Sequence, residues 1–114
     1  MDIERIKPGE WNARGAALGD LIFFSGTVAN DKNAPMKEQT ADVLAKIDAN
    51  LADAGTDKSR ILAATVYLAD IDLKEEMNAA WMAWVDKDNL PTRTALGVKL
   101  TPGTLVEITI TAAR

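Results

Sequence analysis

Two charged side chains, Arg93 and Glu107, stand out near the end of the chain because they lie in otherwise apolar, Thr-rich stretches. An arginine fork is a natural receptor for a carboxylate, and a glutamate can hold or deprotonate a water molecule. Together they could bind a small carboxylated substrate and direct water at it. Arg93 and Glu107 are therefore the candidate catalytic residues, and Arg93 is also a candidate for substrate binding.

Composition alone favours a plainer interpretation, in which Arg93 forms a surface ion pair, for example with Glu107 itself. Two features argue against it. Arg93 follows Pro91–Thr92, a rigid entry that fixes its direction, and no other arginine lies between it and Arg114. For Glu107 the alternative is a solvated strand residue, yet it is the only charge in the last strand before Arg114. Whether the two side chains share a face of an expected hairpin depends on its turn, and the sequence leaves that open.

Ser25, Asn78 and Trp11 are further candidates for substrate binding. Ser25 closes an expected strand before Gly26, and the alternative is a hydroxyl bonded to nearby backbone. Asn78 lies beside the apolar side of an expected helix, where an amide is costly unless paired, and the alternative is an exposed amide. Trp11 lies in a loop-like segment and could cover a pocket or a neighbouring chain.

The composition excludes much familiar chemistry. The chain has no cysteine and no histidine, so Cys-His and Ser-His triads are impossible and we expect no metal site. With a net charge of -4 and dispersed Lys and Arg, we expect no nucleic-acid partner. The chain shows neither a signal core nor a membrane-spanning run, so we expect a cytoplasmic protein without membrane contact. Its 114 residues fit a single domain, residues 1–114.

The hydrophobic patterns predict strands and two helices. Helices are expected at 37–54, ending at Gly55, and at 73–85, with Asp72 and Glu75 as a capping box. Strands are expected at 21–28 (buried on both faces), 59–69, 92–100 and 105–113, with the last two paired as a hairpin across a Pro-Gly turn, and a short first strand is possible at 2–7.

This order of elements predicts an α+β fold with two helices packed on one face of a mixed sheet. The other face is expected to carry small or weakly polar side chains, which would suit self-association. The residues expected on it are Thr65, Tyr67, Ala95, Gly97, Thr109 and Thr111.

Several short motifs in order resemble the RidA/YjgF family of reactive-intermediate enamine/imine deaminases. The motifs are Gln39–Thr40 through Ile47 to Gly55, Thr65-Val66-Tyr67-Leu68-Ala69-Asp70, Met77–Asn78, Pro91-Thr92-Arg93 and Val106-Glu107-Ile108. The likeness covers nearly the whole chain from Leu21 onward. It implies a chorismate-mutase-like fold that forms a homotrimer, with the sheets facing inward and three clefts between subunits.

The resemblance also implies an activity: hydrolysis of enamine/imine intermediates such as 2-aminoacrylate to 2-oxo acids and ammonia, without a cofactor. Arg93 would grip the substrate carboxylate and Glu107 would orient the attacking water. Ser25 matches the family serine that closes the early strand, and Asn78 matches the asparagine of the second helix.

The sequence differs from the family archetype in two places, as in a shorter, divergent branch. The archetype's Gly-Pro-Tyr-Ser-Gln run is replaced by Trp11-Asn12-Ala13-Arg14-Gly15, which lacks the tyrosine, and Ala95 stands where the archetype has cysteine. Trp11 is the candidate replacement for that tyrosine near the cleft. These differences motivate a second hypothesis, a non-catalytic trimer that binds a small carboxylate metabolite in order to sense it or to regulate a partner.

Overall fold

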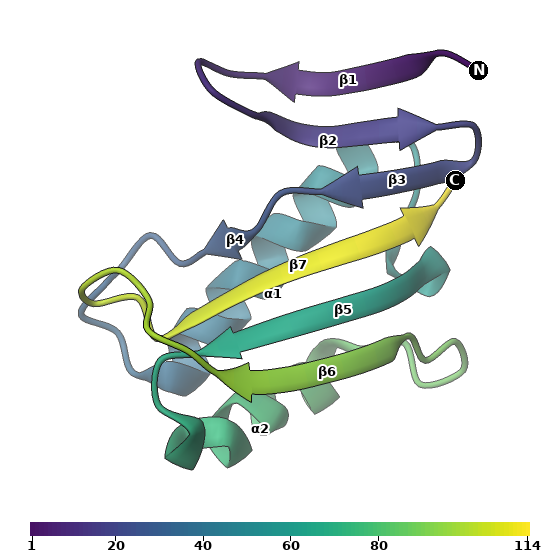
Figure 1. Ribbon diagram of the computed structural model, residues 1–114. Helices are drawn as coiled ribbons and strands as arrows, with labels where there is room; N and C mark the ends of the chain where they lie inside the picture. The colour runs from purple at the N-terminus through teal and green to yellow at the C-terminus, as the bar shows by residue number, and fades with distance from the viewer.

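The computed structural model describes residues 1–114 and contains one seven-stranded sheet with two helices on one of its faces (Figure 1). The strands are β1 (Ile3–Pro8), β2 (Ala13–Leu18), β3 (Leu21–Phe24), β4 (Thr27–Val28), β5 (Ile61–Leu68), β6 (Thr92–Gly97) and β7 (Val106–Ala113); the helices are α1 (Met36–Asp53) and α2 (Lys74–Trp84). Two short 3-10 helices, η1 (Lys58–Arg60) and η2 (Ile71–Leu73), precede β5 and α2. The expected α+β architecture is confirmed. Neither helix combines the length and apolarity needed to cross a membrane.

The order of strands corrects the predicted hairpin. The sheet runs β1-β2-β3-β7-β5-β6, and β4 pairs with β7. Strand β5 therefore lies between β6 and β7, pairing parallel with β6 and antiparallel with β7. The reason is the crossover through α2. After β5 the chain runs back through this helix and enters β6 beside the start of β5, so β6 becomes the parallel neighbour of β5. The chain then crosses the end of β5 before β7 begins.

The first long strand is also interrupted. The predicted strand 21–28 forms as β3 and β4, separated at Ser25–Gly26, where the pairing to β7 breaks. Its burial alternates: Ile22 and Phe24 face the core, whereas Leu21 and Phe23 are 41% and 51% exposed. Burial on both faces was therefore a wrong expectation for the single chain.

The helix ends show one confirmed and one wrong prediction. The first helix ends in a Schellman motif, in which Gly55 has φ +80° and the Thr56 N–H reaches the Leu51 carbonyl at 3.0 Å. The capping box before α2 does not form. The Asp70 carboxylate instead accepts the Asp72 N–H at 2.9 Å and opens η2, because this turn precedes the helix.

The core fills the space between the helices and the sheet. Alternate residues of β7, among them Ile108 and Ile110, face α1, and α1 contributes Leu44, Ile47 and Leu51. On strand β6, Ala95 and Gly97 pair with the core-facing Val66 and Leu68, so they lie on the helix side and not on the helix-free face as predicted.

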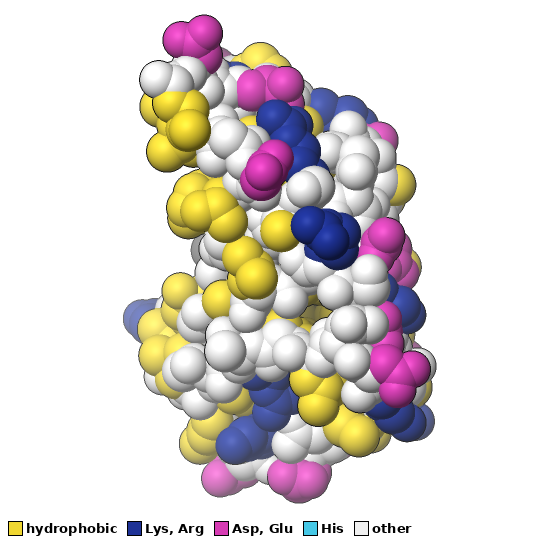
Figure 2. Space-filling view, turned by 90° about the vertical axis from the view of Figure 1, so that its right-hand side faces the viewer, with side chains coloured by type: hydrophobic (Ala, Val, Ile, Leu, Met, Phe, Trp, Pro, Cys, Tyr) yellow, Lys and Arg dark blue, Asp and Glu magenta, His cyan; other side chains and the backbone are white.

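The helix-free face exposes hydrophobic side chains as well as the predicted threonines and Tyr67. These large apolar residues are Ile3, Leu18, Leu21, Phe23, Leu96 and Val98. In Figure 2, hydrophobic side chains gather along the left-hand side of the molecule, the side on which this face lies. Such a row of exposed apolar groups is typical of an association surface.

Gln39 ties α1 to the loop between β6 and β7. Its buried amide nitrogen donates to the Ala34 and Gly103 carbonyls at 3.0 and 2.9 Å, and its oxygen accepts the Leu105 N–H at 3.0 Å. We expect Gln39→Leu to lower the free energy of unfolding by about 3 kcal/mol, because three partly buried backbone groups lose their partner. Urea denaturation measures this change. The exposed neighbour Lys37→Leu is the control, and an equal effect of both substitutions would contradict the prediction.

Candidate functional site

Arg93 lies on β6, an edge strand, and points to the helix side of the sheet. Its backbone pairs with Ala64, which is buried under the helices. The guanidinium lies 5.2 Å from the Trp81 ring centroid, and Nη1 lies 3.8 Å from the Met77 sulfur. The chain's two ion pairs involve other residues, so the guanidinium has no carboxylate partner. Stacking on an aromatic face holds the fork in place and leaves its N–H groups free.

Asn78 lies in the same cavity as Arg93. The amide nitrogen donates weakly to Glu75 Oε1 at 3.3 Å, whereas the amide oxygen is buried and has no hydrogen-bond donor. An unpaired buried oxygen costs about 1–3 kcal/mol, and this one is prepared to accept an N–H. The cavity has a volume of about 470 Å³ and is lined by Glu75, Asn78, Trp81, Met82, Leu90, Pro91 and Arg93.

Glu107 lies on the opposite, helix-free face. Its backbone pairs with Val28 on one side and Tyr67 on the other, and its side chain makes neither an ion pair nor a hydrogen bond within the chain. The carboxylate lies over Gly26, where a Cβ atom would come within 2.1 Å of Oε2. Glu107 lines a second cavity, of about 350 Å³, with Gly26, Tyr67, Val98, Leu100 and Thr109.

The two candidate catalytic residues are therefore on different faces of one sheet. Arg93 aligns with the core-facing Ala64, whereas Glu107 aligns with Tyr67, three residues further along β5 and on the other face. The intervening β5 also removes the hairpin that either register would have required. One chain therefore cannot bring these side chains to the same small molecule. The Arg93–Glu107 ion pair of the plainer interpretation does not form either.

Ser25 and Trp11 occupy the other half of the sheet. The Ser25 hydroxyl donates to the Ala13 carbonyl at 2.6 Å, as the plainer interpretation expects, and lies next to Gly26. Trp11 is 86% exposed in the loop between β1 and β2. Strand β1 and strand β6 form opposite edges of the sheet, so Trp11 and Arg93 are far apart within one chain.

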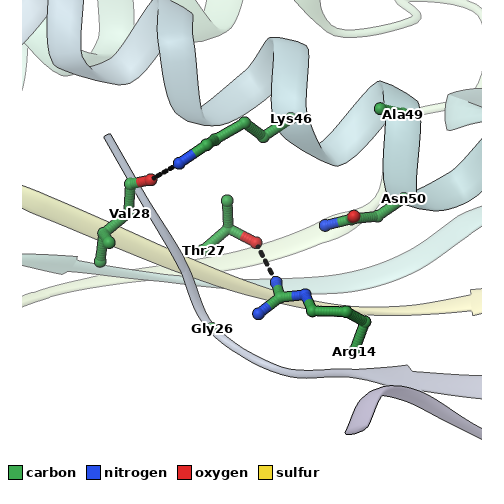
Figure 3. A pocket seen from close by; sticks show the side chains of 7 residues that line it. All are labelled: Arg14, Gly26, Thr27, Val28, Lys46, Ala49 and Asn50. Carbon is green, nitrogen blue, oxygen red and sulfur yellow. Dashed lines mark hydrogen bonds between the residues drawn. The ribbon is translucent and has the colours of Figure 1, made fainter. Parts of the chain in front are cut away.

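A third cavity, which the sequence analysis did not single out, lies between β4 and α1 (Figure 3). Arg14 reaches into it from β2 and Lys46 from α1. Their spacing of 32 positions carries no local signal, because only the packing of β2 and β4 against α1 brings them together. No three His, Cys, Asp or Glu side chains lie close enough to one another to hold a metal ion.

The fold closely matches a solved structure whose protein family is known. The structure matches the crystal structure of a YjgF-family protein from Neisseria meningitidis with a TM-score of 0.96 and 40% sequence identity. The match covers 100% of this chain and 96% of that chain. The arrangement of two helices on one face of this sheet is therefore that of a YjgF protein.

Sequence relatives lead to the same class. A RutC family protein of Haemophilus ducreyi is 46% identical over 99 residues, which covers 86% of this chain and 85% of that protein. The RutC family protein YoaB of Escherichia coli strain K12 is 43% identical over 95 residues, 82% of each protein. A family model described as Endoribonuclease L-PSP matches residues 3–114. The chain belongs to the RutC/YjgF family, which confirms the resemblance found in the sequence.

Proposed function

We propose that this protein hydrolyses enamine/imine intermediates of small carboxylated compounds, such as 2-aminoacrylate, to 2-oxo acids and ammonia without a cofactor. The reaction would take place in a cleft between two copies of the chain. One copy provides the cavity of Arg93 and Asn78, and the other provides the cavity of Glu107. The substrate is a small molecule and not a nucleic acid, because the net charge of -4 and the dispersed basic residues offer no extended basic surface for a phosphate backbone.

The observation that carries the proposal is the free guanidinium of Arg93 beside the unpaired oxygen of Asn78. A planar fork with no carboxylate partner suits the carboxylate of an imino acid. The orphaned amide oxygen suits the N–H of the same molecule. Together the two groups match the carboxylate and the N–H of a 2-imino acid. A simple carboxylic acid has the carboxylate but lacks the N–H.

Glu107 would act on water. Water adds to the imine carbon while the carboxylate of Glu107 takes one of its protons, giving a carbinolamine. The proton then passes from Glu107 to the nitrogen, and ammonia leaves as the hydroxyl gives its own proton to Glu107 and becomes the carbonyl of the 2-oxo acid. Because an iminium carbon is already electrophilic, positioning of substrate and water supplies most of what catalysis needs.

Association is needed because Arg93 and Glu107 face opposite ways in one chain. The exposed apolar side chains of the helix-free face, among them Phe23 and Leu96, provide a surface that a second copy could cover. A homotrimer with inward-facing sheets would cover this face three times and create three clefts. In such an assembly Ser25 and Trp11 would enter the cleft from the copy that carries Glu107.

The test is formation of 2-oxo acid from freshly generated imines of several amino acids, compared with the spontaneous reaction. We expect the protein to accelerate hydrolysis of imines that carry a carboxylate and to leave a carboxylate-free imine at the spontaneous rate. Equal acceleration of both kinds would contradict the role of Arg93. Saturable binding of a 2-oxo acid with no acceleration of any imine would favour the second hypothesis, a carboxylate-binding protein.

A further inference from the structure

The cavity between β4 and α1 has the features of a separate anion site. It has a volume of about 350 Å³ and is lined by Arg14, Gly26, Thr27, Val28, Lys46, Ala49 and Asn50. In Figure 3 the Arg14 guanidinium and the Asn50 amide point into the space below α1, and the Lys46 ammonium lies at another side of that space, against the Val28 carbonyl. Arg93, Asn78 and Glu107 do not line it, and Gly26 is the one residue that it shares with the cavity of Glu107.

Both basic groups keep unused hydrogen-bond donors. The Arg14 guanidinium donates from Nη2 to the Thr27 hydroxyl at 3.0 Å, which leaves most of its five N–H groups without a partner. The Lys46 ammonium donates to the Val28 carbonyl at 2.7 Å and to Asn30 Oδ1 at 2.6 Å, so one of its three N–H groups remains.

No carboxylate compensates these two charges. The ion pairs of the chain are Lys7–Asp53 and Arg114–Glu4, neither of which includes Arg14 or Lys46. Among the acidic residues of α1, Asp42 accepts the backbone N–H of Asn30 at 2.8 Å, and Asp53 pairs with Lys7 at 2.6 Å. Two partly buried cations that line one cavity, with no carboxylate among its lining residues, repel one another and would be stabilised by a bound anion.

Asn50 completes the set of donors. It lies one turn after Lys46 on the same side of α1, and its side chain makes no hydrogen bond within the protein. Its amide can therefore donate to a ligand in the cavity at no cost to the fold. The Arg14 fork is anchored at one nitrogen by Thr27, which fixes the direction of the remaining donors.

We propose that this cavity binds the phosphate group of a small phosphate monoester. A fork, a point charge and an amide give donors from three directions, which fits a tetrahedral dianion better than a planar monocarboxylate. The volume exceeds that of phosphate alone, and Val28 and Ala49 offer apolar contact for a short organic group. The proposal assigns the site a ligand chemistry different from that of the Arg93 cavity.

The test is an NMR titration of backbone amides with inorganic phosphate and with methyl phosphate at neutral pH and constant ionic strength. For wild type we expect saturable shifts centred on Gly26, Thr27 and Asn50, with methyl phosphate binding at least as tightly as phosphate. Asn50→Asp places a negative charge in the cavity without breaking an existing hydrogen bond, and should weaken binding at least about tenfold. Arg14→Lys keeps the charge, loses the fork and should weaken binding several-fold.

The matched control is Asn33→Asp, which adds the same charge to an exposed loop outside the cavity. It should bind phosphate as wild type does. Three outcomes would each overturn the proposal, because each would show only a general attraction of phosphate to positive charge. The first is a set of shifts that rises linearly without saturation. The others are an equal loss of affinity in Asn50→Asp and Asn33→Asp, and an unchanged affinity in Arg14→Lys. Tighter binding of phosphate than of methyl phosphate would overturn the monoester assignment.

Discussion

Replacing Arg93 with alanine is expected to lower kcat/KM for hydrolysis of a carboxylated imine by about 100-fold or more. The guanidinium lies 5.2 Å from the centroid of the Trp81 ring and has no carboxylate partner, so its N–H groups are available to the substrate. Two charge-assisted hydrogen bonds contribute about 3 kcal/mol or more together, which corresponds to that factor. Steady-state formation of 2-oxo acid, corrected for spontaneous hydrolysis, measures the loss.

Two variants show whether the loss is specific to Arg93. Arg93→Lys keeps the charge but cannot form the bidentate contact, and should retain an activity between those of wild type and Arg93→Ala. Lys37→Ala removes an exposed basic residue from α1 with the same change in net charge, away from the helix-free face, and should have wild-type activity. Wild-type turnover by Arg93→Ala would refute the assigned role.

Mixing of impaired variants tests whether the cleft is shared. Arg93→Ala and Glu107→Ala are each expected to have strongly reduced activity alone. When the two are unfolded and refolded together, a mixed assembly contains clefts in which an intact Arg93 from one copy meets an intact Glu107 from the other. Activity should therefore return in the mixture. A mixed assembly without recovered activity would refute the shared cleft, because a single chain holds the two side chains on opposite faces of its sheet.

Gly26→Ala is expected to lower kcat about 10- to 100-fold while the protein remains folded. A Cβ at this position would come within 2.1 Å of Glu107 Oε2, so the carboxylate must move away from β4. The atoms that must move are the end of a flexible side chain, and the backbone at Gly26 does not have a positive φ, so the fold can accept the methyl group. A positioned general base contributes about 100- to 10,000-fold, and a displaced carboxylate loses only part of that effect.

The control for this substitution is Gly15→Ala on the neighbouring strand β2. A Cβ there would make ordinary contacts of 3.5 Å with the Phe23 carbonyl and the Phe24 ring, away from Glu107. Thermal melting of both variants separates folding from catalysis. Gly26→Ala with unchanged kcat, or Glu107→Ala with unchanged kcat, would show that the position of this carboxylate does not matter for the reaction.

The local elements were largely predictable from the sequence because their signals are local. Helix α1 follows the spacing of Leu44, Ile47 and Leu51, and it ends at a glycine that adopts a positive φ. The runs of β-branched residues in β5 and β7 likewise identified strands with few boundary errors. The interruption at Ser25–Gly26 was missed, because a break in pairing depends on the partner strand rather than on the residues that bulge.

The types of residue that bear chemistry were also readable from the sequence alone. Arg93 and Glu107 are charged residues in apolar strands, a pattern that indicates functional residues, and the absence of histidine and cysteine excluded the common triads. The ordered motifs predicted the family, which the relatives and the fold confirm. These conclusions need only residue identity and order along the chain.

Only the tertiary structure decided how these residues face one another. The insertion of β5 between β6 and β7 separates Arg93 from Glu107, and the packing of the sheet against α1 brings Arg14 and Lys46 to one cavity. Both outcomes are pairings between segments distant in sequence, chosen by burial of the whole hydrophobic core. Alternate side chains of a strand point to opposite faces. The identity of the neighbouring strand and a register shift of one residue therefore decide which side chains can meet.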